Sequence, residues 1–238
     1  MGTRLQLGDL EVDVVLKQIK NVHLSVHPPT GRVRIAAPSR MDMNTIRAFA
    51  ISKLGWIRRH QKQLQTQERE AARDYVERET HYVWGHRHLL QIEPTAGRSG
   101  IEVQHSTIVM RVGPETPTRR RHALMQAWYR RLLKEAIAPL CARWAPIVGV
   151  EPKAVAVWRM KTRWGSCSSR RKTIRVNLEL VKKPPQCLEY ILVHEFVHLL
   201  EPTHNERFIK HLDRLLPHWR QLRAELNQAP LGHVTWEY

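Results

Sequence analysis

The chain has 238 residues, 42% of them hydrophobic, which is enough for one large domain or two small ones with a real core. No apolar run approaches the roughly 18 residues that a membrane helix needs, and the first residues lack the apolar core of a signal peptide. The three cysteines are odd in number and far apart, which argues against a disulfide framework. We therefore expect a protein of the reducing cytoplasm with no membrane partner.

The net charge is +17, with several clusters of arginine. This charge has two interpretations. It can serve contact with a polyanion, most simply nucleic acid bound without sequence preference, or with acidic substrates. It can also be spread over solvated helix faces. No helix-turn-helix, zinc-finger or RNA-binding signature accompanies the basic residues, so the sequence leaves both interpretations open.

The first half of the chain reads as strands with one long helix. Apolar residues alternate within 12–16, 22–26 and 33–35, which predicts an antiparallel β segment with a turn at 28–31. From residue 42 or 44 to about 73 they recur at helical spacing, with Asp42 or Asn44 as the N-cap. Strands are expected again over 80–93 and 100–112. We see no internal repeat.

The second half alternates helices and strands. A helix is expected from Thr118 to about Pro146 or Gly149, kinked at Pro139. A strand over 154–160, a loop over 163–169 and a strand over 173–180 follow, and then helices near 184–201, 205–216 and 217–228. The prediction is an α+β fold, with a β-rich N-terminal part (1–113) packed on a C-terminal part (114–238) that carries the chemistry.

The most specific motif is His194-Glu195-Phe196-Val197-His198, an H-E-x-x-H pattern. Two histidines four positions apart lie on one face of a helix, where both imidazoles can bind one Zn²⁺ ion. A glutamate beside the first histidine can take a proton from a metal-bound water without binding the metal. The motif predicts His194 and His198 as zinc ligands and Glu195 as general base.

A third ligand is expected at His204. On an uninterrupted helix His204 would point away from His198, but Pro202 ends the helix and lets the chain fold back. Three protein ligands leave one position for water, as in catalytic zinc sites. Glu225 is a minor alternative for the third ligand. The competing interpretation is a surface helix with ordinary histidines.

Several motifs of the C-terminal half together resemble the YgjP-like metallopeptidases, bacterial relatives of the SprT and Wss-type zincin proteases. They lie at residues 160–168 (MKTRWGSCS), 177–180 (NLEL), 190–199 (YILVHEFVHL) and 204–208 (HNERF). The turn at 31–34, Ala37-Pro38 and Trp56-Ile57 also look like this family but are less diagnostic.

The resemblance implies a zinc-dependent peptidase that acts on protein or peptide substrates. His194, His198 and His204 would hold zinc, and Glu195 would be the base. We expect the strand over 173–180 to lie beside the cleft, where an extended substrate adds as a further strand. The SprT and Wss-type relatives act on proteins cross-linked to DNA, which adds weight to a nucleic-acid partner for this chain.

The roles of the neighbouring residues stay open in part. Phe208 is expected to pack against the third ligand's helix. Trp164 either walls the cleft or fills the core, and Cys167 is more often packing than a reactive or ligating thiol. No residue can be singled out as the oxyanion stabiliser. Two other functions compete with the peptidase: a zinc hydrolase of a non-peptide substrate, and a basic nucleic-acid-binding protein with a vestigial metal site.

Overall fold

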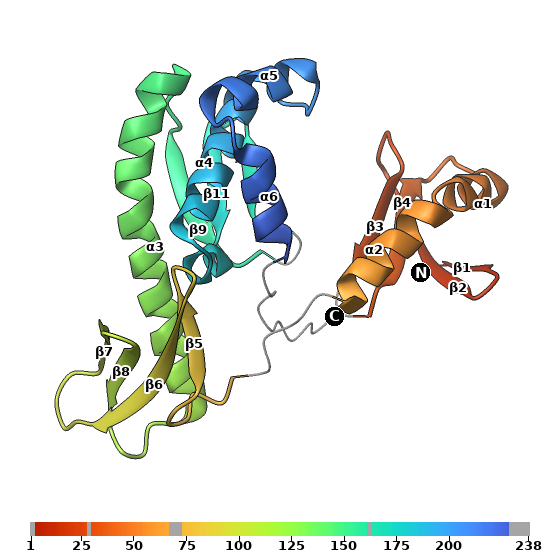
Figure 1. Cartoon of the computed structure of the whole chain (residues 1–238). Coiled ribbons are helices and arrows are strands. Elements are labelled where there is room, and N and C mark those ends of the chain that lie inside the picture. The colour runs from red at the N-terminus through yellow and green to blue at the C-terminus, as the bar shows by residue number, and fades with distance from the viewer. Residues whose placement is uncertain (1–2, 28–29, 67–72, 161–162, 229–238) are drawn as a thin grey trace. The chain divides into compact units, whose positions relative to one another are not determined.

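A computed structural model describes residues 3–27, 30–66, 73–160 and 163–228 (Figure 1). The strands are β1 (Thr3–Leu7), β2 (Leu10–Lys17), β3 (His23–His27), β4 (Arg32–Pro38), β5 (Thr80–Val83), β6 (His86–Pro94), β7 (Gly100–Gln104), β8 (Thr107–Val112), β9 (Ala154–Trp158), β10 (Gly165–Ser168) and β11 (Thr173–Asn177). The helices are α1 (Met43–Ser52), α2 (Leu54–Thr66), α3 (Thr118–Val148), the 3₁₀ helix η1 (Leu178–Lys182), α4 (Pro185–Leu200), α5 (Glu206–Leu215) and α6 (Trp219–Gln228). The α+β class expected from the sequence is present. No helix in these ranges is both long and apolar enough to cross a membrane.

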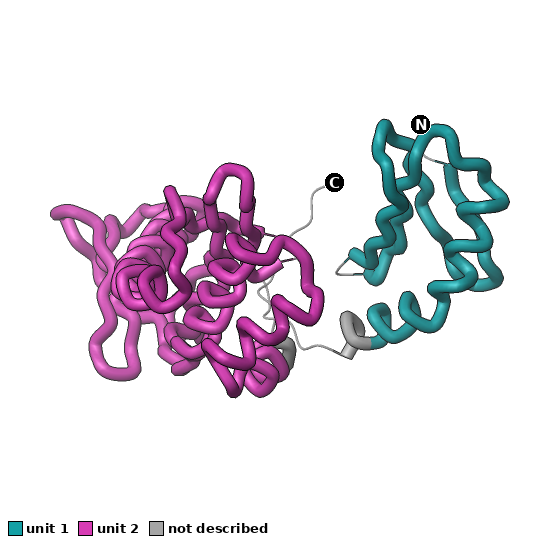
Figure 2. The backbone as a smooth tube through the Cα atoms, turned by 90° about the horizontal axis from the view of Figure 1, so that it is seen from above, with its two compact units in different colours: residues 1–69, 235–238 teal, residues 70–234 magenta. Residues whose placement is uncertain are grey.

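The chain forms two compact units, coloured separately in Figure 2. Unit 1 contains the described residues 3–66, and unit 2 contains the described residues from 73 onward. The division falls between residues 69 and 70, whereas the sequence placed the boundary at 113. The strands over 80–112 therefore belong with the helix that carries the H-E-x-x-H motif.

Unit 1 is a four-stranded sheet with helices α1 and α2 packed on it. The strand order is β1-β2-β4-β3, and β2 pairs with β4 in parallel, so the expected antiparallel segment is only partly right. Alternate strand residues such as Val12 and Ile35 share a buried core with Ile46 and Ile57 of the helices.

The single helix expected from residue 42 or 44 to 73 is two helices. The first begins as predicted, since the Asp42 side chain accepts hydrogen bonds from the amides of Asn44 and Thr45. It ends at Ser52, and the amide of the C-cap residue Lys53 donates to the carbonyl of Ala50 before α2 begins. The expected end near residue 73 lies outside the part of α2 that the structure describes.

The first sheet of unit 2 has the same topology as the sheet of unit 1. Its order is β5-β6-β8-β7, with an antiparallel hairpin β5–β6, a parallel pair β6–β8 and an antiparallel pair β7–β8. In both sheets a two-residue turn joins the first two strands, at residues 8–9 and 84–85. The absence of an internal repeat, expected from the sequence, is therefore wrong at the level of topology. The repeat consists of strand pairing, which alternation of apolar residues does not specify.

The second of these sheets is attached to the rest of unit 2 in two ways. Leu90 and Met110 share one buried core with Met125 and Trp128 of α3. At the β5–β6 turn, the amide of Trp84 donates to the carbonyl of Val181 at 2.7 Å. This shared core and the backbone contact with η1 explain why the boundary lies before β5.

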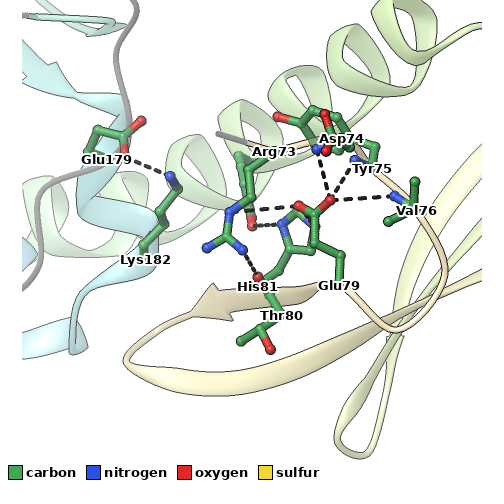
Figure 3. Close-up of polar contacts among 10 residues, drawn as sticks. Arg73, Asp74, Tyr75, Val76, Glu79, Thr80, His81, Glu179 and Lys182 are labelled. Atoms are coloured by element: carbon green, nitrogen blue, oxygen red, sulfur yellow. Dashed lines mark hydrogen bonds and ion pairs between the residues drawn. The ribbon is translucent and has the colours of Figure 1, made fainter. Parts of the chain in front are cut away.

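A buried polar network holds the start of unit 2 (Figure 3). One carboxylate oxygen of Glu79 accepts hydrogen bonds from the amides of Asp74 (2.9 Å) and Tyr75 (2.6 Å), and the other lies 3.2 Å from Nε2 of His81 and 3.7 Å from Nε of Arg73. A carboxylate with only 13% of its side chain exposed needs such partners because it has lost most of its water. The network fixes the chain as it enters β5.

The long helix α3 runs past Pro139 and Pro146 to Gly149, whose left-handed φ of 79° ends it. Its first residue is Thr118, and Pro117 is its N-cap, without a side-chain hydrogen bond.

The second sheet of unit 2 has the order β10-β11-β9. The segment 163–169, expected as a loop, contains β10. The strand expected over 173–180 stops at Asn177, whose side chain accepts from the amide of Glu179 and so caps η1.

Candidate metal centre

Helix α4 carries the H-E-x-x-H motif on a rigid base. It begins as expected, with Pro184 as N-cap and Pro185 in the first turn, where the missing N–H costs nothing. Most of its side chains from Cys187 to Val197 are buried in the core, so the helix cannot turn about its axis. It ends at Glu201, directly before Pro202, as the sequence predicted.

The break brings the three predicted histidines together. Nε2 of His204 lies 3.0 Å from Nε2 of His194, and the three rings have centroids 4.6–5.0 Å apart. One nitrogen from each of His194, His198 and His204 lies within 4.8 Å of the others, which makes them a candidate metal group in the described part of the chain. One Zn²⁺ ion with Zn–N bonds of about 2.0–2.1 Å can reach three such atoms.

The surroundings keep these imidazoles neutral, which is the form that binds metal. Burial is the main cause, and with the neighbouring rings and the charge of Arg223 it lowers the pKa of His194 to about 3. Burial also lowers the pKa of His198 and that of His204. The carbonyl of Glu201 lies 3.2 Å from Nδ1 of His198, a contact that orients this ring and leaves Nε2 for the group.

Phe208 supports all three rings from α5. It is 1% exposed, and its ring centroid lies 4.9, 4.6 and 4.7 Å from those of His194, His198 and His204. Asn205 caps α5 by accepting from the amide of Phe208 at 3.0 Å. The packing role expected for Phe208 is therefore present, and it extends to the whole triad.

Glu195 is buried beside the triad, with 4% of its surface exposed. Burial raises its pKa to about 8, and the positive charge of Arg163 opposes that rise. Its Oε2 atom has no hydrogen-bond partner among the described residues. An orphaned carboxylate oxygen next to three converging imidazoles fits a site that holds a metal ion and a water, so the residues present fit the metal.

Gly165 of β10 leaves room for the side chain of Glu195. A Cβ atom at residue 165 would lie 2.5 Å from Oε1 and 2.8 Å from Cγ of Glu195, closer than real Cβ contacts. Only glycine lets the carboxylate lie against this strand.

A cleft of about 560 Å³ opens over the group. One wall is β10, with Gly165, Ser166 and Cys167, and the other is α4. The strand beside the cleft is thus β10, and the expectation for 173–180 is wrong. The reason is that β11 pairs with β10 on one side and β9 on the other, which leaves it no free edge.

Asn177 fixes the segment that leads into β10. Its side-chain Nδ2 donates to the carbonyls of Met160 and Arg163, both at 2.8 Å. Its backbone N–H donates to the carbonyl of Trp164. Trp164 lines the cleft and also packs against the main core, so it fills both roles left open by the sequence.

Two other candidates from the sequence lie outside the group. Cys167 lines the cleft, but burial and the nearby Glu195 raise its pKa to about 11, which keeps the thiol protonated. Glu225, on α6, accepts from Gln186 instead of joining the histidines. All three cysteines are free.

Sequence reasoning missed Gly165 and Asn177. A glycine within a strand can mark a close approach of another group, and a buried asparagine at a strand end can mark a side chain that hydrogen-bonds neighbouring backbone groups. Both signals were present in the segment that was assigned to a loop and a strand.

A comparison with known families covers most of the chain. The family model described as "YgjP-like, metallopeptidase domain" matches residues 20–229. The chain belongs to the YgjP-like metallopeptidase family. No curated protein matches the chain.

Two solved structures are similar to part of this YgjP-like chain. The metallopeptidase zymogen abylysin of Pyrococcus abyssi is 20% identical, covers 37% of this chain and 89% of its own, and has a TM-score of 0.35. The metallopeptidase zymogen jannalysin of Methanocaldococcus jannaschii is 21% identical, covers 39% and 88%, and has a TM-score of 0.36.

Proposed function

We propose that this protein is a zinc-dependent peptidase in which His194, His198 and His204 hold the metal and Glu195 is the general base. The observation that carries the proposal is the convergence of three neutral imidazole nitrogens within 4.8 Å beside a buried carboxylate with an orphaned oxygen. A zinc ion bound there would polarise the scissile carbonyl and lower the pKa of its water towards about 7.

Glu195 takes the proton from the attacking water and passes it to the leaving amine. Its raised pKa of about 8 suits this task, because a base whose pKa lies near the working pH both accepts and releases a proton readily. Gly165 keeps the carboxylate in place against β10.

The substrate lies extended along β10. This strand is at the edge of its sheet and forms the cleft wall that faces α4, so its outer backbone groups can pair with an added strand. Protein or peptide chains fit such an edge. With three free cysteines, a reducing cytoplasm is the proposed setting.

Metal analysis tests the proposal. Purified protein should contain close to one equivalent of zinc, and His204→Ala should lower the content at limiting zinc. His211→Ala is the matched control, because His211 lies on the following helix α5 and is not part of the triad. Unchanged zinc in His204→Ala would show that His204 is not a ligand.

A further inference from the structure

Positive charge is concentrated around the strand that forms the wall of the cleft. Between Glu151 and Glu179 the sequence has eight Lys or Arg residues and no Asp or Glu. This segment contains β9, β10 and β11, the whole second sheet of unit 2. An uninterrupted run of one charge on one small sheet is more specific than the overall charge of +17.

The cations stand at both ends of β10. Arg163 lies two residues before the strand and lines the cleft, while Arg170, Arg171 and Lys172 form the turn after it. All four are exposed, and none forms an ion pair with any residue that the structure describes. All four can therefore contact a ligand, and the charge of Arg163 also acts on the buried Glu195.

The rest of the cleft does not balance this charge. Glu195 is the one acidic residue among those that line it. Outside the lining, Arg223 of α6 is close enough to His194 and His204 to act on them electrostatically. Arg163 is the one Lys or Arg in the lining, and the exposed cations of the turn after β10 lie outside it, so the positive excess is around the cleft. Such an excess raises the local concentration of acidic ligands.

The shape of the site favours a polypeptide as that ligand. The free edge of β10 offers alternating N–H and C=O groups, which match the main chain of an extended peptide and not the backbone of a nucleic acid. The four strand residues span roughly 13 Å, so a peptide paired with them reaches the cations at both ends.

We propose, building on the peptidase function above, that the cleft selects polypeptide segments with acidic side chains on both sides of the cleaved bond. Arg163 binds the acidic residues on one side, and Arg170 and Arg171 bind those on the other.

A binding experiment tests this without depending on cleavage. Zinc-loaded Glu195→Gln protein is titrated into three labelled ten-residue peptides that differ only in flanking Glu, Gln or Lys residues, and fluorescence anisotropy is measured. The Glu peptide should bind at least about tenfold more tightly than the Gln peptide at low salt, with the difference shrinking as salt rises. The Lys peptide should bind most weakly.

Substitutions locate the effect. Arg163→Gln and the double variant Arg170→Gln/Arg171→Gln should each reduce the preference, by roughly two- to fivefold per charge as expected for exposed ion pairs. Arg98→Gln, an exposed arginine in the loop between β6 and β7, is the matched control and should leave the preference unchanged. Zinc content confirms that each variant keeps the site.

Three results would overturn the proposal. Equal affinity for the Glu and Gln peptides would remove the selectivity. A loss of preference that is as large in Arg98→Gln would assign it to overall charge. Tighter binding of a single-stranded oligonucleotide that displaces the Glu peptide, with the same dependence on Arg163 and Arg170, would assign the surface to nucleic acid. Failure of the peptidase function itself would show as absent hydrolysis by wild type, which leaves the binding result readable.

Discussion

The two four-stranded sheets of this molecule share one topology and serve different purposes. Among the residues that the structure describes, the sheet β1–β4 shares its buried core with α1 and α2. The sheet β5–β8 shares its core with α3 and the rest of unit 2, including α4. The same arrangement of strands thus forms a core with two helices in unit 1 and is part of the core that includes the metal-centre helix in unit 2.

The turns of the two hairpins show where the difference arises. Gly8 and Gly85 both have positive φ, 63° and 83°. Nothing lies within 4 Å of a Cβ built at Gly8, whereas one at Gly85 would lie 3.0 Å from Cγ of Pro184, the N-cap of α4. Whether a sheet is attached to the helix that carries the metal centre therefore depends on what its turn contacts and not on the topology of the sheet.

Truncating a buried side chain in each sheet should show the difference between the two sheets most strongly. Ile35 in β4 and Met110 in β8 are both fully buried in corresponding strands. Ile35→Ala and Met110→Ala should each cost about 2–5 kcal/mol through lost burial and the cavity left behind. Hydrogen exchange by mass spectrometry should show faster exchange in β2 and β4 for Ile35→Ala with zinc content unchanged, and in unit 2 with weakened zinc binding for Met110→Ala. Loss of zinc in Ile35→Ala would contradict the independence of unit 1.

Alanine at the two turn glycines should give a smaller and unequal effect. Gly8→Ala should cost about 1 kcal/mol, because only the left-handed backbone is penalised. Gly85→Ala should cost about 2–3 kcal/mol, since the new Cβ also presses on Pro184. Thermal unfolding monitored by circular dichroism measures both costs, and zinc release on heating shows whether the metal centre is affected. Equal effects on zinc release would mean that the β5–β6 turn does not support α4.

The sequence predicts features of the fold and the site that depend on neighbouring residues, and it does not predict contacts between distant ones. The motif helix, its start at Pro185 and its end before Pro202 follow from local rules, and so did the meeting of His204 with the pair. The parallel pairing of β2 with β4 did not, because alternation fixes the face of a strand and not its partner. Gly165 was missed since its role depends on Glu195, thirty residues later in the chain.

The smallest expected effect is the loss of one ion pair of unit 1 on acidification. A hydrogen bond from Arg32 lowers the pKa of Asp13 on the open face of the β1–β4 sheet. A lowered folded-state pKa means that the pair contributes stability above the unfolded value, near 4, and loses it as the pH falls through the folded value. Asp13→Asn should remove this dependence. Exchange rates in β2 measured between pH 6 and pH 3 would test it, and an unchanged pH dependence in the variant would contradict it.

The central claim is that Glu195 activates water at a zinc ion held by the three histidines, and its most direct test is one matched comparison. Zinc-loaded wild type and Glu195→Gln, with equal zinc content, are assayed on the same protein substrate. The amide is nearly the same size and cannot take the proton, so the account predicts equal metal and a loss of at least about a hundredfold in hydrolysis. Hydrolysis by Glu195→Gln at the wild-type rate would contradict it, because another group would then be the base.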